Sequence, residues 1–430
     1  MSSGLPETAL LRAIQWGKLG FKAGSAALGS LLEDSSSGKK DYILHKIAAP
    51  VVETMLKLRG GPMKIGQFLS MQDSILPAEF IELLKPLQSQ APAIEFSKIE
   101  SFLKSKRVNL DNFFKSVYPT AMAAASIGQV HETVTHENQK LVTKFQYPGI
   151  GRSMKSDLWL LKITLKPIFS MLIETNQEVI WNELEQRLLA EIDFSKELQY
   201  QEEYHLRFHG SDELVVPKPV RSHSSDYFLS SEPLFGLSLG EAKQYSQALR
   251  DKWGLSIFKF ILQGILREPQ FHADPHPGNF AFLDDGRVIV YDFGQIKPLD
   301  SQFQENYRKL LASVVEGSIE EVQQNLWDIG ISQVKTGRPV SIGMVEDHLQ
   351  LLRKALNNGF TNENILSELI DTGEKYWGES RRLDVPYHLI YLHRTFAGLA
   401  GLLNTLGAEA DWGEELLNIC ELKKTPSALH

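Results

Sequence analysis

Residues 272–294 read HADPHPGNFAFLDDGRVIVYDFG and carry the motif spacing that decides the fold. His272, Asp274 and His276 alternate at the start of this stretch, and imidazole and carboxylate groups are suitable ligands for zinc or iron. Two prolines interrupt the three side chains and disfavour the paired strand that would bring them to one face. No further ligand cluster stands out elsewhere in the chain, so a metal site is the weaker interpretation of this stretch.

The same stretch has the spacing of a phosphoryl-transfer site. Asp274 precedes Asn279 by the interval found in the kinase catalytic loop, where the Asp accepts a hydroxyl proton and the Asn holds magnesium. Apolar residues on both sides of Asp285-Gly286 predict a β-hairpin, which ends at Asp292-Phe293-Gly294. An Asp at that place binds the magnesium that bridges the phosphates. We therefore favour nucleotide chemistry and expect the two histidines to shape the loop.

A magnesium-nucleotide site also needs a cation for the phosphates and an acid that positions it. Lys144 lies in LVTK, on the second of two strands predicted between residues 121 and 148, where kinases place such a lysine. Glu191 on the following charged helix is the first candidate for its partner, and Asp193 and Glu197 lie close by. The alternative is that these acids form the solvated face of that helix.

The candidate phosphate cradle lacks the usual glycines. Ala123, Ala124, Ala125 and Ser126 stand where kinases use a glycine-rich turn whose bare amides approach the phosphates, and Gly128 follows. Alanine does not share the positive φ angles of glycine, so we expect a stiffer loop. The alternative is a helix that starts with small residues for packing.

Composition limits the classes of function. The 430 residues carry a net charge of −8, which argues against a general nucleic-acid binder. The one cysteine excludes a disulfide within the chain and fits a reducing compartment. We find no signal peptide and no run of eighteen apolar residues, so the chain is expected in the cytoplasm without a transmembrane segment. Residues 12–32 predict an amphipathic helix that packs on its own protein or, alternatively, lies on a membrane surface.

Helical and strand patterns alternate in an order that predicts an α+β protein. We expect an N-terminal amphipathic helix and linker, then a helical extension, then a small strand-rich lobe with inserted helices, and finally a larger helical lobe that carries the loop and hairpin. The corresponding ranges are 1–45, 46–118, 119–236 and 237–430.

Five motifs in order resemble the UbiB/ADCK family of atypical kinase-like proteins. They are a KxGQ motif, an alanine-rich loop, an ExD motif, a loop of HxDxHPGN type and a DFG motif. In this chain they are Lys64-Ile65-Gly66-Gln67, Ala123 to Ser126, Glu191-Ile192-Asp193, His272 to Asn279, and Asp292-Phe293-Gly294. The similarity spans about residues 45–410, and LHR at 392–394 also matches a run of the family.

The resemblance implies a bilobal protein-kinase-like fold whose helical KxGQ extension covers the active-site cleft. Lys64 and Gln67 are then expected to face the nucleotide site and the ExD acids. It also implies that Glu191 pairs with Lys144.

The resemblance further implies ATP and Mg²⁺ as cofactors. Asn279 and Asp292 are expected to hold the magnesium, and residues 230–234, among them Glu232 and Leu234, to form the hinge beside adenine. Asp274 is the expected base or water-positioning residue. The family is associated with ATP hydrolysis and with isoprenoid quinone synthesis at membranes, which implies isoprenoid lipids or quinone-pathway proteins as partners.

Two other functions are open at this point. One is a small-molecule phosphotransferase of the aminoglycoside or choline kinase type, which also uses a His-x-Asp loop with a nearby Asn. The KxGQ motif and the alanine-rich loop argue against it. The other is a nucleotide-gated scaffold or lipid chaperone without a phospho-acceptor, which the stiff loop and the covering extension would suit.

Overall fold

A computed structural model of the chain describes Glu53 and most residues from 93 to 421. The gaps after residue 93 are 125–126, 149, 151–157, 160–161, 164–176, 335, 359–367, 369–370, 374 and 381. The described chain belongs to two compact units. Unit 1 comprises Met1–Leu198 and Pro219–Pro233, and unit 2 comprises Gln199–Lys218 and Leu234–His430.

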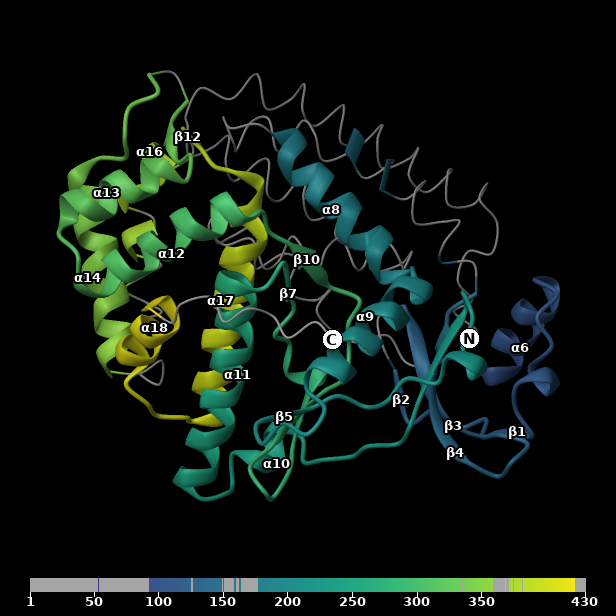
Figure 1. The fold of residues 1–430 in the computed structure, drawn as a ribbon. Helices are drawn as coiled ribbons and strands as arrows, with labels where there is room; N and C mark the ends of the chain where they lie inside the picture. The colour runs from purple at the N-terminus through teal and green to yellow at the C-terminus, as the bar shows by residue number, and fades with distance from the viewer. Residues whose placement is uncertain are drawn as a thin grey trace. The chain divides into compact units, whose positions relative to one another are not determined.

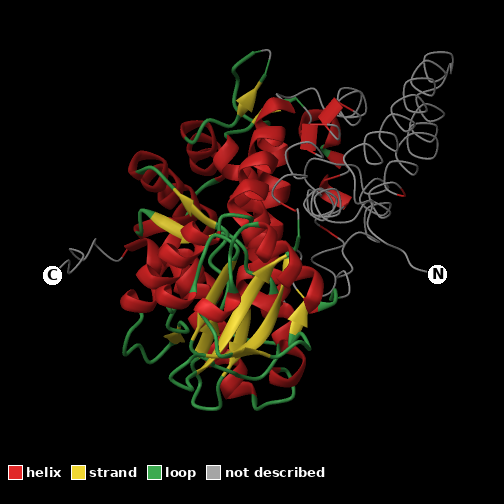
Figure 2. Ribbon diagram, turned by 90° about the vertical axis from the view of Figure 1, so that its right-hand side faces the viewer, coloured by secondary structure: helices red, strands yellow, loops and turns green. Residues whose placement is uncertain are grey.

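Unit 1 is built on an antiparallel sheet in the order β1-β3-β4-β6, with β2 also paired to β3 (Figure 2). The two predicted strands appear as β3 and β4, and their register places His131 opposite Thr143 and Val130 opposite Lys144. The strand bounds are β1 Ser116–Val117, β2 Ala123–Ala124, β3 Gly128–Val134, β4 Lys140–Gln146 and β6 Phe228–Ser231.

The alternation of side chains along these strands gives the sheet of unit 1 two different faces. Phe145 and Phe228 point to one face and pack there with Ile99 and Leu103 of α6 (Phe96–Ser105). Lys144 lies between the inward-facing Thr143 and Phe145 and so points to the opposite face. A short helix, η3 (Leu110–Asn112), follows α6, and η4 (Arg221–His223) precedes β6.

Two helices follow the strand pair, and an aspartate separates them. α8 spans Gln177–Glu191 and α9 spans Phe194–Arg207, so the helical region predicted across them is interrupted at residues 192–193. The Asp193 carboxylate accepts a hydrogen bond of 3.0 Å from the backbone N–H of Lys196. This is the bond of a helix N-cap, and it explains why a new helix begins here. Residues of α9 from Gln199 onward belong to unit 2.

Unit 2 contains the predicted hairpin as β8 (Phe280–Phe282) and β9 (Val288–Val290). Gly286 at its turn has φ +90°, a conformation that favours glycine. β5 (Leu214–Val215) pairs in parallel with β9, which places the segment before residue 219 in unit 2. The predicted strand-rich lobe, 119–236, and unit 1 therefore differ mainly at residues 199–218, which the pairing of two strands distant in the sequence assigns to unit 2.

The helices of unit 2 enclose one apolar core. The bounds are α10 Leu239–Ala242, α11 Gln247–Arg267, α12 Ser301–Glu316, α13 Ile319–Asp328, α14 Ile342–Asn358, α16 Trp377–Ser380, α17 Tyr387–Leu406 and α18 Trp412–Glu421. Two further pairs of short strands are β7 (Gln270–His272) with β10 (Ile296–Pro298) and β11 (Ser332–Gln333) with β12 (Leu383–Asp384).

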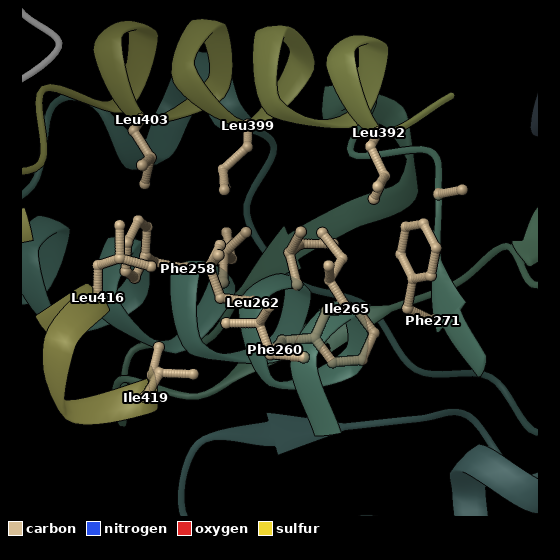
Figure 3. Close-up of a cluster of buried hydrophobic side chains, with 14 of the residues drawn as sticks. Phe258, Phe260, Leu262, Ile265, Phe271, Leu392, Leu399, Leu403, Leu416 and Ile419 are labelled. Carbon is tan, nitrogen blue, oxygen red and sulfur yellow. The ribbon is translucent and has the colours of Figure 1, made fainter. Parts of the chain in front are cut away.

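The long helices α11 and α17 run side by side in this core (Figure 1). Leu262 and Ile265 of α11 face Leu392 and Leu399 of α17, and Leu416 of α18 closes one end (Figure 3). Each such side chain contributes about 1.5–3 kcal/mol when it is fully buried. The core therefore fixes α17 against α11, in the unit that also carries Asp274, Asn279 and Asp292.

The mixture of helices and sheets confirms the α+β class. The predicted helix at 12–32 and the KxGQ extension lie outside the described residues. Among the described helices, none combines the length and the apolar character that crossing a membrane requires.

Candidate functional site

The side chain of Asp274 is held from two directions in unit 2. Its Oδ2 atom accepts a hydrogen bond of 3.0 Å from the amide of Asn279, and its Oδ1 atom accepts one of 3.0 Å from Arg394. The Asn279 amide also donates to the backbone carbonyl of Asp274 at 2.9 Å. The predicted spacing of Asp274 and Asn279 thus brings their side chains into direct contact.

Sequence motifs assign no role to Arg394 of α17, although it is the last residue of the LHR run at 392–394. Its side chain is 6% exposed, whereas that of Asp274 is 25% exposed. The guanidinium also donates to the carbonyl oxygen of Ala273 at 2.6 Å, and Thr395 donates to the same oxygen at 3.2 Å. Arg394 therefore fixes both the backbone and the carboxylate of the loop. It stands 120 positions after Asp274 in the sequence, so no local pattern could have indicated this contact.

His272 connects the loop to the DFG motif. Its Nε2 atom lies 2.6 Å from the carbonyl oxygen of Asp292, and its Nδ1 atom accepts from the backbone N–H of Asp274 at 3.4 Å. Both contacts are satisfied by a neutral ring with the proton on Nε2. Burial lowers the pKa of His272, which favours this neutral form.

The zinc or iron interpretation does not agree with this geometry. The ring of His276 accepts from the N–H of Gly278 at 3.1 Å, so both histidines of the loop serve its backbone. Within the part of the chain that the structure describes, no three His, Cys, Asp or Glu side chains are grouped to hold a metal ion. The two histidines shape the loop, as the sequence predicted.

Asn279 and Asp292 have the atoms that magnesium requires. The amide nitrogen of Asn279 is occupied by Asp274, which leaves its Oδ1 atom as the ligand atom. One oxygen of Asp292 accepts from the N–H of Gly294 at 2.9 Å, which fixes the direction of the carboxylate. The hairpin brings the two residues close together, because Tyr291 donates from its backbone N–H to the carbonyl oxygen of Asn279 at 3.0 Å. Oxygen ligands of this kind suit Mg²⁺.

In unit 1, Lys144 is bound to Glu197. The lysine Nζ atom lies 2.8 and 3.1 Å from the two carboxylate oxygens of Glu197. It also lies 5.3 Å from the centre of the Phe194 ring, within the range of a cation–π interaction. The lysine is 16% exposed and the glutamate only 3%.

This pairing corrects the expectation that Glu191 holds Lys144. Glu191 is the last residue of α8, and the chain turns before α9 begins. Glu197 lies in the first turn of α9, on the helix that also brings Phe194 to the lysine. Asp193 caps α9 through its own side chain. Asp193 therefore serves the helix that carries the partner of Lys144.

The described part of the alanine-rich loop is extended and not helical. Ala123 and Ala124 form β2 and pair with Val130 and Gln129 of β3. A side chain at Gly128 would place its Cβ atom 2.2 Å from the carbonyl oxygen of Phe145, so glycine is required by the close approach of β4. The residues that complete the predicted cradle, Ala125 and Ser126, lie outside the described residues, as do Lys64 and Gln67.

The predicted hinge residues fall at the boundary of the two units. Glu232 follows β6 in unit 1, and Leu234 begins the second segment of unit 2. The carbonyl oxygen of Leu234 accepts a hydrogen bond of 3.0 Å from the hydroxyl of Tyr291. Burial raises the pKa of Tyr291 to about 12, so this hydroxyl keeps its proton. Sequence reasoning did not identify Tyr291, although it directly precedes the DFG motif.

Comparison with known proteins agrees with the family that the motifs indicate. Residues 86–326 match the model of the ABC1 atypical kinase-like domain. A curated Arabidopsis thaliana protein named Activity of BC1 complex kinase 7, chloroplastic, is 27% identical over 427 residues, covering 94% of this chain and 59% of the relative. The atypical kinase COQ8, mitochondrial, of Saccharomyces cerevisiae is 25% identical over 421 residues, covering 95% of this chain and 84% of the relative.

A solved structure shares the fold. The Mycobacterium tuberculosis protein Rv3197, determined as a complex with erythromycin, superposes with a TM-score of 0.59 at 24% identity, covering 89% of this chain and 97% of that one. The chain spans about three fifths of the length of the Arabidopsis relative. Because the family model matches more than half of the sequence, the chain belongs to the family of ABC1 atypical kinase-like proteins.

Proposed function

We propose that the protein is an ATP-dependent kinase-like enzyme, an ATPase or phosphotransferase that uses magnesium. The observation that carries this proposal is the double anchoring of Asp274 by Asn279 and Arg394. A carboxylate held in one orientation, and still a quarter exposed, is suited to accept the proton of a hydroxyl or to position a water molecule.

The other contacts supply the remaining parts of a phosphoryl-transfer site. Asn279 and Asp292 would hold Mg²⁺, whose charge offsets the negative charge that develops on the phosphates. Lys144, oriented by Glu197, would bind the phosphates as a point charge. We assign the alanine-rich loop, Ala123 to Ser126, to the phosphate cradle, and Glu232 with Leu234 to the adenine.

Lys64, Gln67, Glu191 and Asp193 complete the proposed site. The KxGQ and ExD motifs support a role for the extension in limiting access to the nucleotide. Glu191 is buried, which is unusual for a glutamate unless it has a partner. We therefore propose it as a residue that the extension contacts.

The resemblance to the quinone-associated family supports a more specific role in isoprenoid quinone or lipid metabolism. An isoprenoid lipid or a quinone-pathway protein is then the proposed partner. Contact with a membrane surface through residues 12–32 is part of the same proposal.

Thermal unfolding with and without Mg²⁺ and ATP tests the central proposal. A ligand at about a hundred times its dissociation constant stabilises the protein that binds it by about 2.7 kcal/mol. We expect a magnesium-dependent stabilisation of the wild type that Asp292→Asn removes. Asp285→Asn, an exposed aspartate of the hairpin turn, is the matched control and should keep the stabilisation. If ATP and magnesium do not shift the unfolding of the wild type, the proposed function is wrong.

A further inference from the structure

The side-chain amide of Gln129 in β3 binds both polar groups of the Ile94 backbone. Its Oε1 atom accepts from the N–H of Ile94 at 2.9 Å, and its Nε2 atom donates to the carbonyl oxygen of Ile94 at 3.0 Å. A neighbouring β-strand would offer that residue the same two bonds. Both residues belong to unit 1, and Gln129 is fully buried. Gln129 therefore clamps the chain two residues before α6 begins.

The clamp lies within the predicted extension, 46–118, and follows its KxGQ motif along the chain. The part of the extension that comes after the clamp is held differently, because Ile99, Leu103 and Phe114 are buried against the sheet. Two kinds of contact therefore fix the extension to unit 1. They are the hydrogen bonds at Ile94 and the apolar packing, most of it from α6 onward. Loss of the hydrogen bonds leaves the packing of α6 in place.

His131 determines which way the amide of Gln129 points. The Nδ1 atom of His131 lies 2.7 Å from the carbonyl oxygen of Tyr118, so Nδ1 carries the proton in the neutral ring. The Nε2 atom of the ring is then an acceptor, and it lies 2.8 Å from the amide nitrogen of Gln129. That nitrogen has two hydrogens, one for the ring and one for the Ile94 carbonyl. With a neutral ring, every polar group of the amide and the imidazole is paired.

A second proton on the ring reverses this arrangement. The Nε2 atom of His131 and the amide nitrogen of Gln129 would both be donors, opposed at hydrogen-bond distance. Turning the amide over removes the conflict, because its oxygen then faces the imidazolium. The same turn sets that oxygen against the Ile94 carbonyl and the NH₂ group against the Ile94 N–H. One proton therefore breaks both bonds of the clamp.

The surroundings of His131 favour the neutral ring at pH 7. The side chains that neighbouring elements present to the ring carry no charge; they are Phe96, Phe145 and Thr143. Glu132, the next residue of β3, points to the opposite face and pairs with Lys140. Tyr118 contributes its backbone carbonyl, while its side chain is 50% exposed.

Burial lowers the pKa of His131, and the hydrogen bond to the Tyr118 carbonyl partly offsets this effect. No charged side chain among the described residues alters that pKa. The ring is therefore neutral at neutral pH and takes up its proton only as the pH falls below about 6.5.

We propose that Gln129 and His131 form a proton-operated clamp on the extension, which holds Ile94 to the sheet while His131 is neutral and releases it when His131 is protonated. Acid then loosens the attachment of the segment that carries the KxGQ motif, while α6 stays packed. The inference goes beyond the proposed function and does not depend on nucleotide binding.

Hydrogen exchange of the Ile94 N–H in the full chain tests the clamp. Its protection factor, corrected for the intrinsic effect of pH on exchange, should fall about 5- to 150-fold between pH 7.5 and pH 5.0. This range corresponds to about 1–3 kcal/mol for a buried group that loses its partner. The amide of Leu103 in α6 is the internal reference and should lose far less protection. An unchanged Ile94 protection factor, or an equal fall at Leu103, would overturn the inference.

Two substitutions should remove the response to pH in opposite ways. His131→Phe cannot be protonated and should keep the Ile94 N–H protected at both pH values, whereas Gln129→Leu should leave it unprotected at both. His131→Gln is a second neutral variant, for use if the larger ring does not fit. His388→Gln is the matched control, because burial also lowers the pKa of His388 in unit 2, and it should keep the wild-type response. A wild-type response in either His131 variant would overturn the assignment of the proton to this histidine.

Discussion

Two cation–carboxylate pairs at the proposed site residues, Lys144–Glu197 in unit 1 and Arg394–Asp274 in unit 2, are buried in opposite senses. In unit 1 the carboxylate of Glu197 is 3% exposed and its lysine partner 16%. In unit 2 the guanidinium of Arg394 is 6% exposed and its partner Asp274 25%. In each pair the more accessible member is the residue that the proposed function uses. The buried member holds it in place, so stability and activity should respond differently to changes in the two members.

The largest expected effect is on the rate of ATP turnover, and it follows from removing the charge of Asp274, the more accessible member of the pair in unit 2. Asp274→Asn should lower the rate of ATP turnover by about 10²- to 10⁴-fold, because the amide cannot accept the proton of the attacking group. The dissociation constant of Mg·ATP should change only a few-fold. Phosphate release and calorimetric binding measure the two quantities, and Asp285→Asn serves as the control. A variant that keeps its turnover would show that Asp274 does not act on the attacking group.

The second effect concerns the buried carboxylate in unit 1. Lys144→Met removes the lysine from a buried glutamate and should lower the free energy of unfolding by about 3 kcal/mol. Adding Glu197→Gln should recover much of this loss, since the remaining charge is then removed. Lys140→Met is a matched control, because Lys140 pairs with Glu132 while 67% exposed and should cost less than about 1 kcal/mol. Denaturant unfolding that shows equal losses for the two single variants would contradict the comparison.

The third prediction separates charge from geometry in the unit 2 pair. Arg394→Lys keeps the positive charge but cannot reach both Asp274 and the Ala273 carbonyl with a planar group. The free energy of unfolding should fall by about 1–2 kcal/mol, because one buried hydrogen bond is lost. Arg338→Lys on the exposed surface should leave it unchanged. If chemical denaturation gives the same free energy of unfolding for both variants, the planar guanidinium of Arg394 does not contribute to stability.

The smallest effect should come from pH. Burial lowers the pKa of His272 in the folded protein, so the unfolded chain binds its proton first as the pH falls below about 6.5. Stability should therefore be constant above that pH and decrease below it, by at most about 1.4 kcal/mol per pH unit for each such histidine. His131 and His388 have lowered pKa values for the same reason and should add to the slope. The free energy of unfolding should fall less between pH 7.5 and 5.5 in His272→Gln than in the wild type. An equal fall in the two proteins would show that His272 does not contribute to the pH dependence of stability.

Local patterns were sufficient for much of the fold. The alternating strands around Lys144 and the apolar runs around Asp285-Gly286 produced the two hairpins, because strand pairs joined by short turns depend on neighbouring residues. The parallel pairing of β5 with β9 was not predicted, since it joins residues more than seventy positions apart, about Leu214 and Val288. The sequence therefore assigned residues 199–218 to the strand-rich lobe, whereas the structure groups them with unit 2.

The candidate site shows the same limit. The spacing from Asp274 to Asn279 translates into direct contact, because both lie on one loop. Arg394 reaches that loop only after α17 has packed on α11, which no local pattern reports. The choice of Glu191 over Glu197 as the lysine's partner failed because it depended on where one helix ends and the next begins. The hydrogen bond from the Lys196 N–H to the Asp193 carboxylate determines where α9 begins.

The short connection after the DFG motif has a consequence for inhibitor chemistry. Residues 295–300 include β10, which pairs with β7, and α12 begins at once at Ser301. Phe293 is fully buried, with its ring 5.1 Å from that of Tyr204. Compounds that bind kinases by turning this phenylalanine outward would have to separate β10 from β7 and open the core. Chemical probes for this protein should therefore be drawn from scaffolds that accept the inward orientation of the phenylalanine.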